Sequence, residues 1–230
     1  MKLNERIIVA TRNAGKAKEF SRLLEPFGVA VGSLLDHPEL PEVEETGTTF
    51  AENAMLKART IAELLRIPVL ADDSGLCVDA LNGAPGVYSA RYAGEHAADA
   101  DNNAKLLKEL APFGLRPIGG GDSLPVTEDQ ASGQEAAPGR EQPLVYSPAR
   151  FVCVLAVFDP GSGGGLTVEG ECRGYILPAP RGSNGFGYDP LFYIPASRQT
   201  LAEMTMEKKN AVSHRAQALH ELVQVLEKRT

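Results

Sequence analysis

Ile67-Pro68-Val69-Leu70 leads directly into Ala71-Asp72-Asp73-Ser74-Gly75, and this stretch decides the class of fold. The apolar run predicts a buried strand, and the glycine-containing stretch after it predicts a turn at the strand's carboxyl end. In α/β sheets, ligands bind at that end. Because unpaired buried carboxylates are costly, these two acids predict a divalent metal or a metal-bound phosphate as their partner. The alternative is that both acids only cap the turn, as aspartates often do.

The composition indicates a globular domain. The chain has 230 residues and a hydrophobic content of 43%, which is enough for a substantial core. No apolar run reaches the roughly 18 residues of a membrane span, so we expect no membrane association and no signal peptide. Three cysteines, Cys77, Cys153 and Cys172, lie in apolar or strand-like contexts. They predict buried free thiols and a cytoplasmic protein.

The charge of the chain restricts its partners. The formal net charge is −7. A protein that binds a nucleic-acid polymer needs a basic face, so this charge argues against DNA or RNA. A single nucleotide stays possible, because its phosphates need only a few local cations and a metal.

Periodic apolar residues predict strands and helices before and after the acidic pair. Arg6-Ile7-Ile8-Val9-Ala10 is typical of a short buried strand. A helix should follow, with its apolar side formed by Phe20, Leu23, Leu24 and Phe27. Thr49-Phe50-Ala51-Glu52 is a capping box that should open a second helix, with Ala54, Ala58, Ile61 and Leu65 inward. A third helix is expected over residues 101–110, with Leu106, Leu107 and Leu110 inward.

Residues 112–149 interrupt this pattern. They are rich in Gly, Pro, Ser, Gln and Glu, and such a composition buries too little surface to offset ordering entropy. We expect a mobile insertion within a single domain of residues 1–230. The reason is that Phe151–Phe158 is too apolar to stand outside a shared core. Leu166–Glu171 should pair with it as a β-hairpin across a glycine-rich loop.

A candidate anion site lies between the first strand and the first helix. Backbone N–H groups and the helix dipole favour anions there, and a lysine adds a cation. The sequence is not a P-loop, because the spaced first glycine is absent and Ala17 follows the lysine. The candidate residues of this loop are Thr11, Arg12, Asn13, Ala14, Gly15 and Lys16.

The C-terminal quarter carries a second candidate site, over residues 181–190. Its glycines allow the backbone to approach a ligand closely, and Phe186 between them could stack on a base. The alternative is a tight turn with Phe186 and Tyr188 in the core.

A helix should begin at Asn210 and continue towards the C-terminus. Its expected apolar stripe is formed by Val212, Ala216, Leu219, Val223 and Leu226. His214 and Arg215 lie off that stripe near the helix N-terminus, where cations are disfavoured. A ligand carbonyl or phosphate would explain both.

The ordered motifs resemble one known family over nearly the whole chain, residues 112–149 excepted. The motifs are Thr11-x-Asn13-x-x-Lys16, Glu44-Glu45-Thr46-Gly47, Thr49-Phe50-x-Glu52-Asn53-Ala54, Ala71–Gly75, Gly83-Ala84-Pro85-Gly86-x-Tyr88-Ser89-Ala90-Arg91, Gly185–Pro190 and Ser213-His214-Arg215. The chain closely resembles the Ham1/RdgB family of inosine triphosphate pyrophosphatases.

The resemblance implies a mixed α/β fold with an elongated central sheet, flanking helices and two lobes that enclose a nucleotide cleft. It also implies a homodimer. Family members use Mg²⁺ to hydrolyse noncanonical purine nucleoside triphosphates (ITP, dITP and XTP) to the monophosphate and pyrophosphate, which removes damaged nucleotides from the pool.

The resemblance also implies roles for single residues. Glu44 or Glu45 together with Asp73 would hold magnesium, and Asp73 would be the general base. The residues implied to contact substrate are Thr11, Asn13, Lys16, Lys57, Ser74, Phe186, Gly187, Tyr188, Asp189, Lys209, His214 and Arg215. Arg215 could meet the 6-keto group that inosine and xanthine share.

Two other functions stay open. One is a pyrophosphatase for modified pyrimidine or standard nucleoside triphosphates, and the other is a nucleotide sensor without hydrolysis. Strand alternation places Asp72 and Asp73 on opposite faces, so we expect different tasks for them. Asp73 should serve metal and water, and Asp72 should hold the loop.

Overall fold

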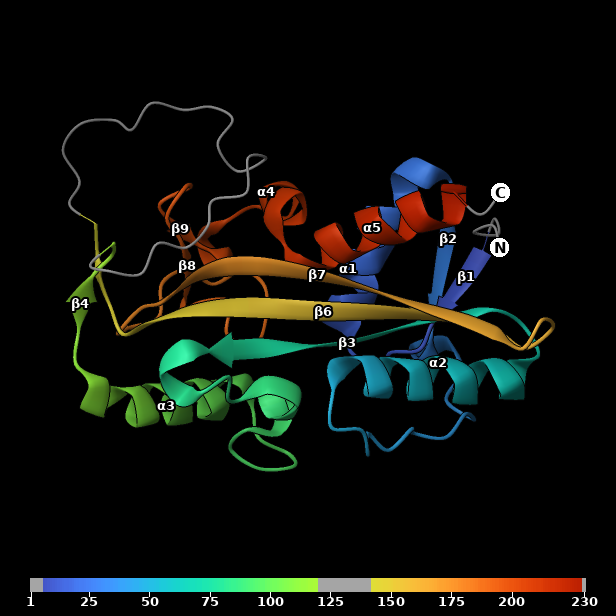
Figure 1. Cartoon of the computed structure of the whole chain (residues 1–230), viewed down its shortest axis with the longest axis horizontal. Coiled ribbons are helices and arrows are strands. Elements are labelled where there is room, and N and C mark those ends of the chain that lie inside the picture. The colour runs from blue at the N-terminus through green and yellow to red at the C-terminus, as the bar shows by residue number, and fades with distance from the viewer. Residues whose placement is uncertain (1–5, 120–141, 229–230) are drawn as a thin grey trace. The chain divides into compact units, whose positions relative to one another are not determined.

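The computed structural model describes residues 6–119 and 142–228, and it is built around a mixed sheet (Figure 1). A seven-stranded sheet has the order β2-β1-β3-β6-β7-β8-β9. β1 pairs in parallel with β2 and β3, whereas β8 is antiparallel to β7 and β9. The strands are Arg6–Val9 (β1), Ala30–Ser33 (β2), Val69–Val78 (β3), Arg116–Pro117 (β4), Leu144–Val145 (β5), Ser147–Asp159 (β6), Gly164–Ile176 (β7), Phe192–Ile194 (β8) and Gln199–Thr200 (β9).

The α-helices flank this sheet, as the mixed α/β prediction requires. They are Ala14–Leu24 (α1), Phe50–Leu65 (α2), Asp99–Leu110 (α3), Met206–Val212 (α4) and His214–Lys228 (α5). Short 3-10 helices lie at Glu25–Phe27 (η1), Leu34–Asp36 (η2), Asp79–Leu81 (η3), Gly86–Arg91 (η4), Ala111–Phe113 (η5) and Leu201–Glu203 (η7). In the part of the chain that the structure describes, no helix has both the length and the apolar character to cross a membrane.

The chain divides into two compact units. The first contains residues 6–75, 151–172 and 210–228, and the second contains residues 76–119, 142–150 and 173–209. β3, β6 and β7 contribute residues to both units. The single domain predicted from the sequence stays a prediction.

The first unit has a core on each face of its sheet. One core packs α1 and α5 against Leu70, Cys153 and Leu155. The other packs α2 against Val69, Val154 and Ala156 (Figure 1). Neighbouring residues on one strand therefore face different helices, and this arrangement positions the acids of β3.

The helix starts in this unit follow local sequence signals. The Asn13 side chain accepts a hydrogen bond from the Lys16 backbone N–H and so caps α1. Thr49 and Glu52 form the reciprocal capping box of α2, which confirms the prediction for that helix. Pro26 lies in η1 just after α1, and Phe27 is 50% exposed, so its predicted place on the inward side of the helix was wrong.

The predicted turn at the aspartate pair was also wrong. β3 extends from Val69 to Val78, and Asp72, Asp73 and Gly75 lie within it. The strand can continue because cations from neighbouring helices pair with both acids, so neither charge has to leave the sheet for water. The alternative of two turn-capping aspartates is thereby excluded.

The C-terminal helix begins in two steps. α4 ends at Val212, and α5 starts at His214 after Ser213, whose hydroxyl accepts a hydrogen bond from the Ala216 N–H. This break resets the helical phase, so the predicted apolar stripe was only partly right: Leu219 and Leu226 are buried, whereas Val212, Ala216 and Val223 are partly exposed. The buried residues of α5 are His214, Arg215, Ala218, Leu219, Leu222 and Leu226.

The second unit contains α3 and the two-stranded antiparallel sheet β4–β5. β4, β5 and the start of β6 lie within residues 112–119 and 142–149, so both ends of the predicted insertion carry regular structure. The rest of it, residues 120–141, lies outside the described residues. β6 and β7 are adjacent strands joined by a short turn, which confirms the predicted hairpin, and both are longer than expected. Within the described residues, the three cysteines are buried and form no disulfide bond.

Candidate functional site

Asp72 lies on the α1 and α5 face of β3 and is surrounded by cations. Its Oδ2 atom is 2.8 Å from Lys16 Nζ and 3.6 Å from Arg215 Nε. The Ser74 hydroxyl donates to the same oxygen over 3.1 Å. Arg215 also donates to Ser74 Oγ at 2.9 Å and to Glu19 Oε2 at 2.8 Å. Asp72 thus connects the start of α1 to the start of α5.

This environment keeps Asp72 ionised. Burial by itself would raise the pKa of this carboxyl, since Asp72 is only 1% exposed. The positive charges of Lys16 and Arg215 outweigh burial and hold the pKa far below its ordinary value. A carboxylate of this kind is a fixed anchor and a poor proton acceptor.

Asp73 lies on the opposite face of β3 and contacts α2. Asn53 Nδ2 donates to its Oδ2 atom over 3.2 Å, and Lys57 Nζ is 3.3 Å from its Oδ1 atom. The same lysine nitrogen is 2.8 Å from Glu45 Oε1, so two carboxylates converge on one ammonium group. Asn53 Oδ1 accepts the Gly47 N–H over 2.7 Å, which connects the loop before α2 to Asp73.

The protonation behaviour of Asp73 is opposite to that of Asp72. Burial raises the pKa of Asp73, and the nearby Glu45 charge adds to the effect, although Lys57 opposes it. Burial would lower the pKa of Lys57, but the three carboxylates of Asp73, Asp72 and Glu45 raise it. Asp73 is therefore the carboxylate of the pair that can take up a proton.

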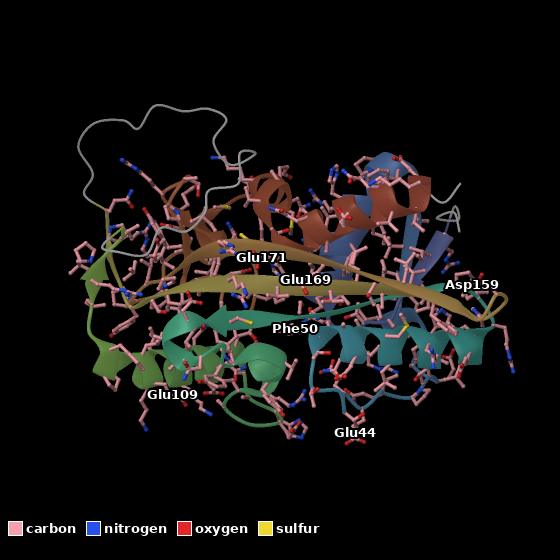
Figure 2. All side chains as sticks on the ribbon, in the orientation of Figure 1. Glu44, Phe50, Glu109, Asp159, Glu169 and Glu171 are labelled. Atoms are coloured by element: carbon pink, nitrogen blue, oxygen red, sulfur yellow. The ribbon has the colours of Figure 1, made fainter. Side chains whose placement is uncertain are left out.

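The two glutamates before α2 differ in position. Glu45 is half-buried and paired with Lys57, whereas Glu44 is exposed. Figure 2 shows the Glu44 side chain pointing outward from the loop that precedes α2. Of the two, only Glu45 is held near Asp73.

A magnesium ion would fit this pair of carboxylates. Within residues 6–119 and 142–228, no three His, Cys, Asp or Glu side chains lie close enough to form a metal site by themselves. Mg²⁺ commonly takes one or two carboxylates and completes its shell with water and substrate phosphates. Glu45 and Asp73 already meet at one cation, the Lys57 ammonium, and so offer that donor set.

The loop before α1 is ordered by its own side chains. Thr11 Oγ1 accepts the Asn13 N–H over 3.2 Å, and Thr11 is 8% exposed. Ala14, Gly15 and Lys16 form the first turn of α1. Arg12 donates to the carbonyl oxygens of Leu34 at 3.1 Å and Leu40 at 2.5 Å, so its guanidinium holds the 34–40 segment.

His214 and Arg215 are both buried in the first unit. The His214 ring stacks on Phe151 with ring centroids 4.9 Å apart and an interplanar angle of 12°. α5 can approach β7 this closely because residue 170 is glycine: a Cβ atom at Gly170 would lie 2.2 Å from the Ala218 nitrogen. The periodicity of apolar residues could not predict this position, because His214 and Arg215 are polar residues that are nevertheless buried.

The glycine-rich loop of the second unit is built around Asp189. Its Oδ2 atom accepts from Lys209 Nζ at 2.6 Å and from the Phe186 N–H at 3.0 Å. Lys209 Nζ also lies 4.9 Å from the centre of the Phe186 ring. Gly185 has φ = +77°, and a Cβ atom there would be 2.0 Å from Asp189 Oδ2. Only glycine fits beside this carboxylate.

Tyr188 has a different environment from Phe186. It is 3% exposed and donates from its hydroxyl to the Ser89 carbonyl oxygen over 2.9 Å. Tyr188 therefore plugs the core of the second unit, as the alternative for this loop expected, whereas Phe186 stays half-buried.

Two buried polar residues were not recognised as parts of the site from the sequence. Asn53 is 1% exposed and Glu19 is 2% exposed. Asn53 directly precedes Ala54 of the predicted apolar stripe. A polar residue beside that stripe was the sequence signal from which a buried role for Asn53 could have been predicted. Glu19 offered no comparable signal, because its partner Arg215 lies far along the chain.

A family model described as the Ham1 family matches residues 7–117 and 129–225. The gap between the two matched ranges lies inside residues 112–149. A dITP/XTP pyrophosphatase from Geobacillus kaustophilus is 50% identical over 216 residues, which cover 94% of this chain and 91% of the relative.

Solved structures agree with the sequence matches. The structure of a HAM1 protein from Coxiella burnetii has a TM-score of 0.74 and 38% identity, covering 97% of this chain and 98% of that one. A nucleoside-triphosphatase / dITP/XTP pyrophosphatase from Mycobacterium abscessus has a TM-score of 0.66 and 41% identity, covering 94% and 98%. These neighbours support the mixed α/β fold.

Proposed function

Since the chain belongs to the Ham1 family, we propose that it hydrolyses the noncanonical purine nucleoside triphosphates ITP, dITP and XTP to the nucleoside monophosphate and pyrophosphate. It is a hydrolase that acts on acid anhydrides. Removal of damaged nucleotides from the pool is the corresponding cellular role.

The environment of Asp73 is the observation that carries this proposal. Asp73 is 5% exposed, its pKa is raised chiefly by burial, and Asn53 and Lys57 hold its two oxygens. A buried carboxylate with a raised pKa is a better proton acceptor than an ordinary one and is suited to general-base catalysis. We assign to Asp73 the removal of a proton from the water that attacks the triphosphate.

The start of α1 is the proposed phosphate site. The first N–H groups of a helix have no partner within it and favour anions. Lys16 adds a positive charge, and Asp72 holds its ammonium group at 2.8 Å. The residues that would orient the phosphates together with Lys16 are Thr11, Asn13, Ala14, Gly15 and Lys57.

Glu45 and Asp73 would hold Mg²⁺. When bound, the ion would neutralise charge on the phosphates and on the leaving pyrophosphate. Lys57 supports this assignment, because its ammonium group lies within ion-pair distance of both carboxylates and holds them close to one another. Glu44 is exposed and receives no such role.

Phe186 is the proposed purine-stacking residue of the second unit. Asp189 holds its backbone N–H, and Lys209 lies over its ring. Gly187 gives this loop its turn, and Tyr188 anchors it in the core. A half-buried aromatic ring on such a support can stack on a base with little ordering cost.

The remaining predicted contacts favour support over direct recognition. Arg215 donates to Ser74 and Glu19, and the Ser74 hydroxyl donates to Asp72. His214 stacks on Phe151, and Arg12 holds the 34–40 segment. We therefore propose that the site of the first unit is held in place by Arg12, Ser74, His214 and Arg215.

Assembly and compartment follow the family resemblance. We propose a homodimer, which sedimentation of the purified protein tests; a monomeric mass would contradict it. Three buried cysteines that form no disulfide bond within the described residues support a cytoplasmic location.

The deciding experiment is a turnover assay with Mg²⁺ that measures pyrophosphate and single phosphate separately. We expect pyrophosphate from ITP, dITP and XTP at rates at least about 10²-fold above those for ATP and GTP. Equal rates on all purines would contradict the specificity. Preferential turnover of modified pyrimidines would favour the rival pyrophosphatase, and binding without turnover would favour a sensor.

A further inference from the structure

Helix α3 holds both backbone polar groups of Gly187. Asp99 Oδ2 accepts the Gly187 N–H over 2.6 Å, and Asn103 Nδ2 donates to the Gly187 carbonyl oxygen over 3.0 Å. The two side chains are four residues apart and so lie on one side of the helix. The Gly187 carbonyl oxygen also fixes the orientation of the Asn103 side-chain amide, because within that amide only Nδ2 can donate a hydrogen bond.

Gly187 directly follows Phe186, and Phe186 needs such a restraint. It lies between two glycines with left-handed backbone, Gly185 at φ = +77° and Gly187 at φ = +62°. Glycine has more conformational freedom to lose than any other residue, so a Gly-Phe-Gly segment is costly to order. Asp189 holds the Phe186 N–H from one side of the loop. The bonds from α3 fix the other side.

We propose that Asp99 and Asn103 are positioning residues that fix the loop for stacking of Phe186 on the purine. They are not catalytic residues, because they act only through Gly187. The proposal rests on the proposed function, which makes Phe186 the stacking residue. By ordering the loop before substrate arrives, the two side chains reduce the entropy lost on binding.

Asp101 provides a matched control for a merely structural role. It lies in the same first turn of α3, and its carboxylate accepts the Ala98 N–H over 3.1 Å. Asp101→Ala therefore removes an acid and a cap from α3 without touching Gly187. Asp99→Asn is the conservative counterpart, because its amide oxygen can still accept the Gly187 N–H.

Steady-state kinetics with ITP test the positioning role. We expect Asp99→Ala to raise KM about 10-fold and Asn103→Ala about 5-fold, with kcat within about twofold of the parent. Asp99→Asn should have a KM much closer to that of the parent than Asp99→Ala has. Asp101→Ala should leave KM within about twofold of the parent while lowering stability. An equal rise of KM in Asp101→Ala, or no recovery in Asp99→Asn, would overturn the proposal.

A fluorescent reporter tests the loop independently of turnover. The chain has no tryptophan, so Phe186→Trp introduces a single reporter at the stacking position. Asp99→Ala in that background should lower the tryptophan anisotropy and increase acrylamide quenching, whereas Asp101→Ala should change neither. An unchanged reporter overturns the positioning role whatever the activity. A loosened reporter in a protein whose parent hydrolyses none of the three substrates supports the positioning role and overturns the proposed function.

Discussion

Asp72 and Asp73 are the same residue type at adjacent positions of β3, and the two faces of the strand give them different chemistry. On the α1 and α5 face, Lys16 and Arg215 hold the pKa of Asp72 far below its ordinary value despite burial. On the α2 face, burial and Glu45 raise the pKa of Asp73 although Lys57 is near. The sign of each shift follows the number of cations beside the carboxylate: two approach Asp72, whereas Asp73 shares the one ammonium group of Lys57 with Glu45.

The comparison explains how one strand can serve two purposes. A carboxylate approached by two cations is an anchor that stabilises the fold, while one that shares a single cation with another acid can exchange a proton or bind a metal. Removal of Asp73 should therefore affect turnover, and removal of Asp72 should affect stability. The following substitutions separate the two faces.

Asp73→Asn should have the largest effect on activity. The amide cannot accept the proton of water and is a weaker ligand for Mg²⁺, so we expect kcat to fall by about 10³-fold or more. Stability should change little, because burial already disfavours the charged form of this carboxyl. Turnover of ITP together with a urea unfolding curve measures both. Retained turnover would show that another group is the base.

Asp72→Asn should have the opposite profile. The substitution leaves Lys16 and Arg215 without the carboxylate between them, and loss of one partner of a buried pair costs about 3 kcal/mol of unfolding free energy. The folded fraction should retain more turnover than Asp73→Asn does. Urea unfolding measures the loss, and a stability equal to that of the parent would contradict the anchoring role.

The two glutamates before α2 extend the comparison to the metal site. Glu45→Gln should lower kcat about 50-fold at limiting Mg²⁺ and raise the Mg²⁺ concentration needed for half-maximal rate. Glu44→Gln is the matched control and should stay within about twofold, because that side chain is exposed. Titration of activity with Mg²⁺ measures both variants. Equal effects would contradict the assignment of Glu45.

Asn53→Ala tests the support of Asp73. It removes the hydrogen bonds to Asp73 and from Gly47, so we expect turnover to fall about 10-fold. Glu52→Ala is its control: Glu52 caps α2 through the Thr48 and Thr49 N–H groups and does not contact Asp73. We expect Glu52→Ala to lose about as much stability as Asn53→Ala and to keep normal turnover. Equal loss of turnover in both variants would show that Asn53 only stabilises the helix.

Local signals in the sequence predicted several features correctly. The capping box at Thr49, the β6–β7 hairpin and the placement of Asp72 and Asp73 on opposite faces depend on residues only a few positions apart. Periodicity of this kind is readable without knowledge of the tertiary structure.

Features that depend on distant partners were not predictable. β3 continues through its acids because Lys16 and Arg215 come from helices at the two ends of the chain. The burial of Arg215 depends on Glu19 and on the break at Ser213, which changes the face that α5 presents. Neither pairing leaves a periodic trace in the sequence.

The pH dependence of stability should have the smallest effect and the most specific sign. Because the pKa of folded Asp72 is lowered, its stabilisation is present above the ordinary pKa and is lost as pH falls through the folded value. Because the pKa of folded Asp73 is raised, it stabilises below the ordinary value, and this contribution is lost as pH rises through the folded value. Asp72 therefore makes stability rise with pH below the ordinary aspartate pKa, whereas Asp73 makes stability fall with pH above it, and each contributes at most about 1.4 kcal/mol per pH unit.

Unfolding free energies in urea with EDTA, measured below and above the ordinary aspartate pKa, test this difference in sign. Asp73→Asn removes the falling contribution, so stability should rise more steeply with pH than in the parent. Asp72→Asn removes the rising contribution and should flatten the profile. Chelation is needed because a metal ion bound to Asp73 would itself lower the pKa of that carboxyl. If both variants changed the slope of unfolding free energy against pH in the same direction, the pKa values of Asp72 and Asp73 could not be shifted in opposite directions. The distinction between Asp72 as the anchor and Asp73 as the base would then lose its electrostatic ground.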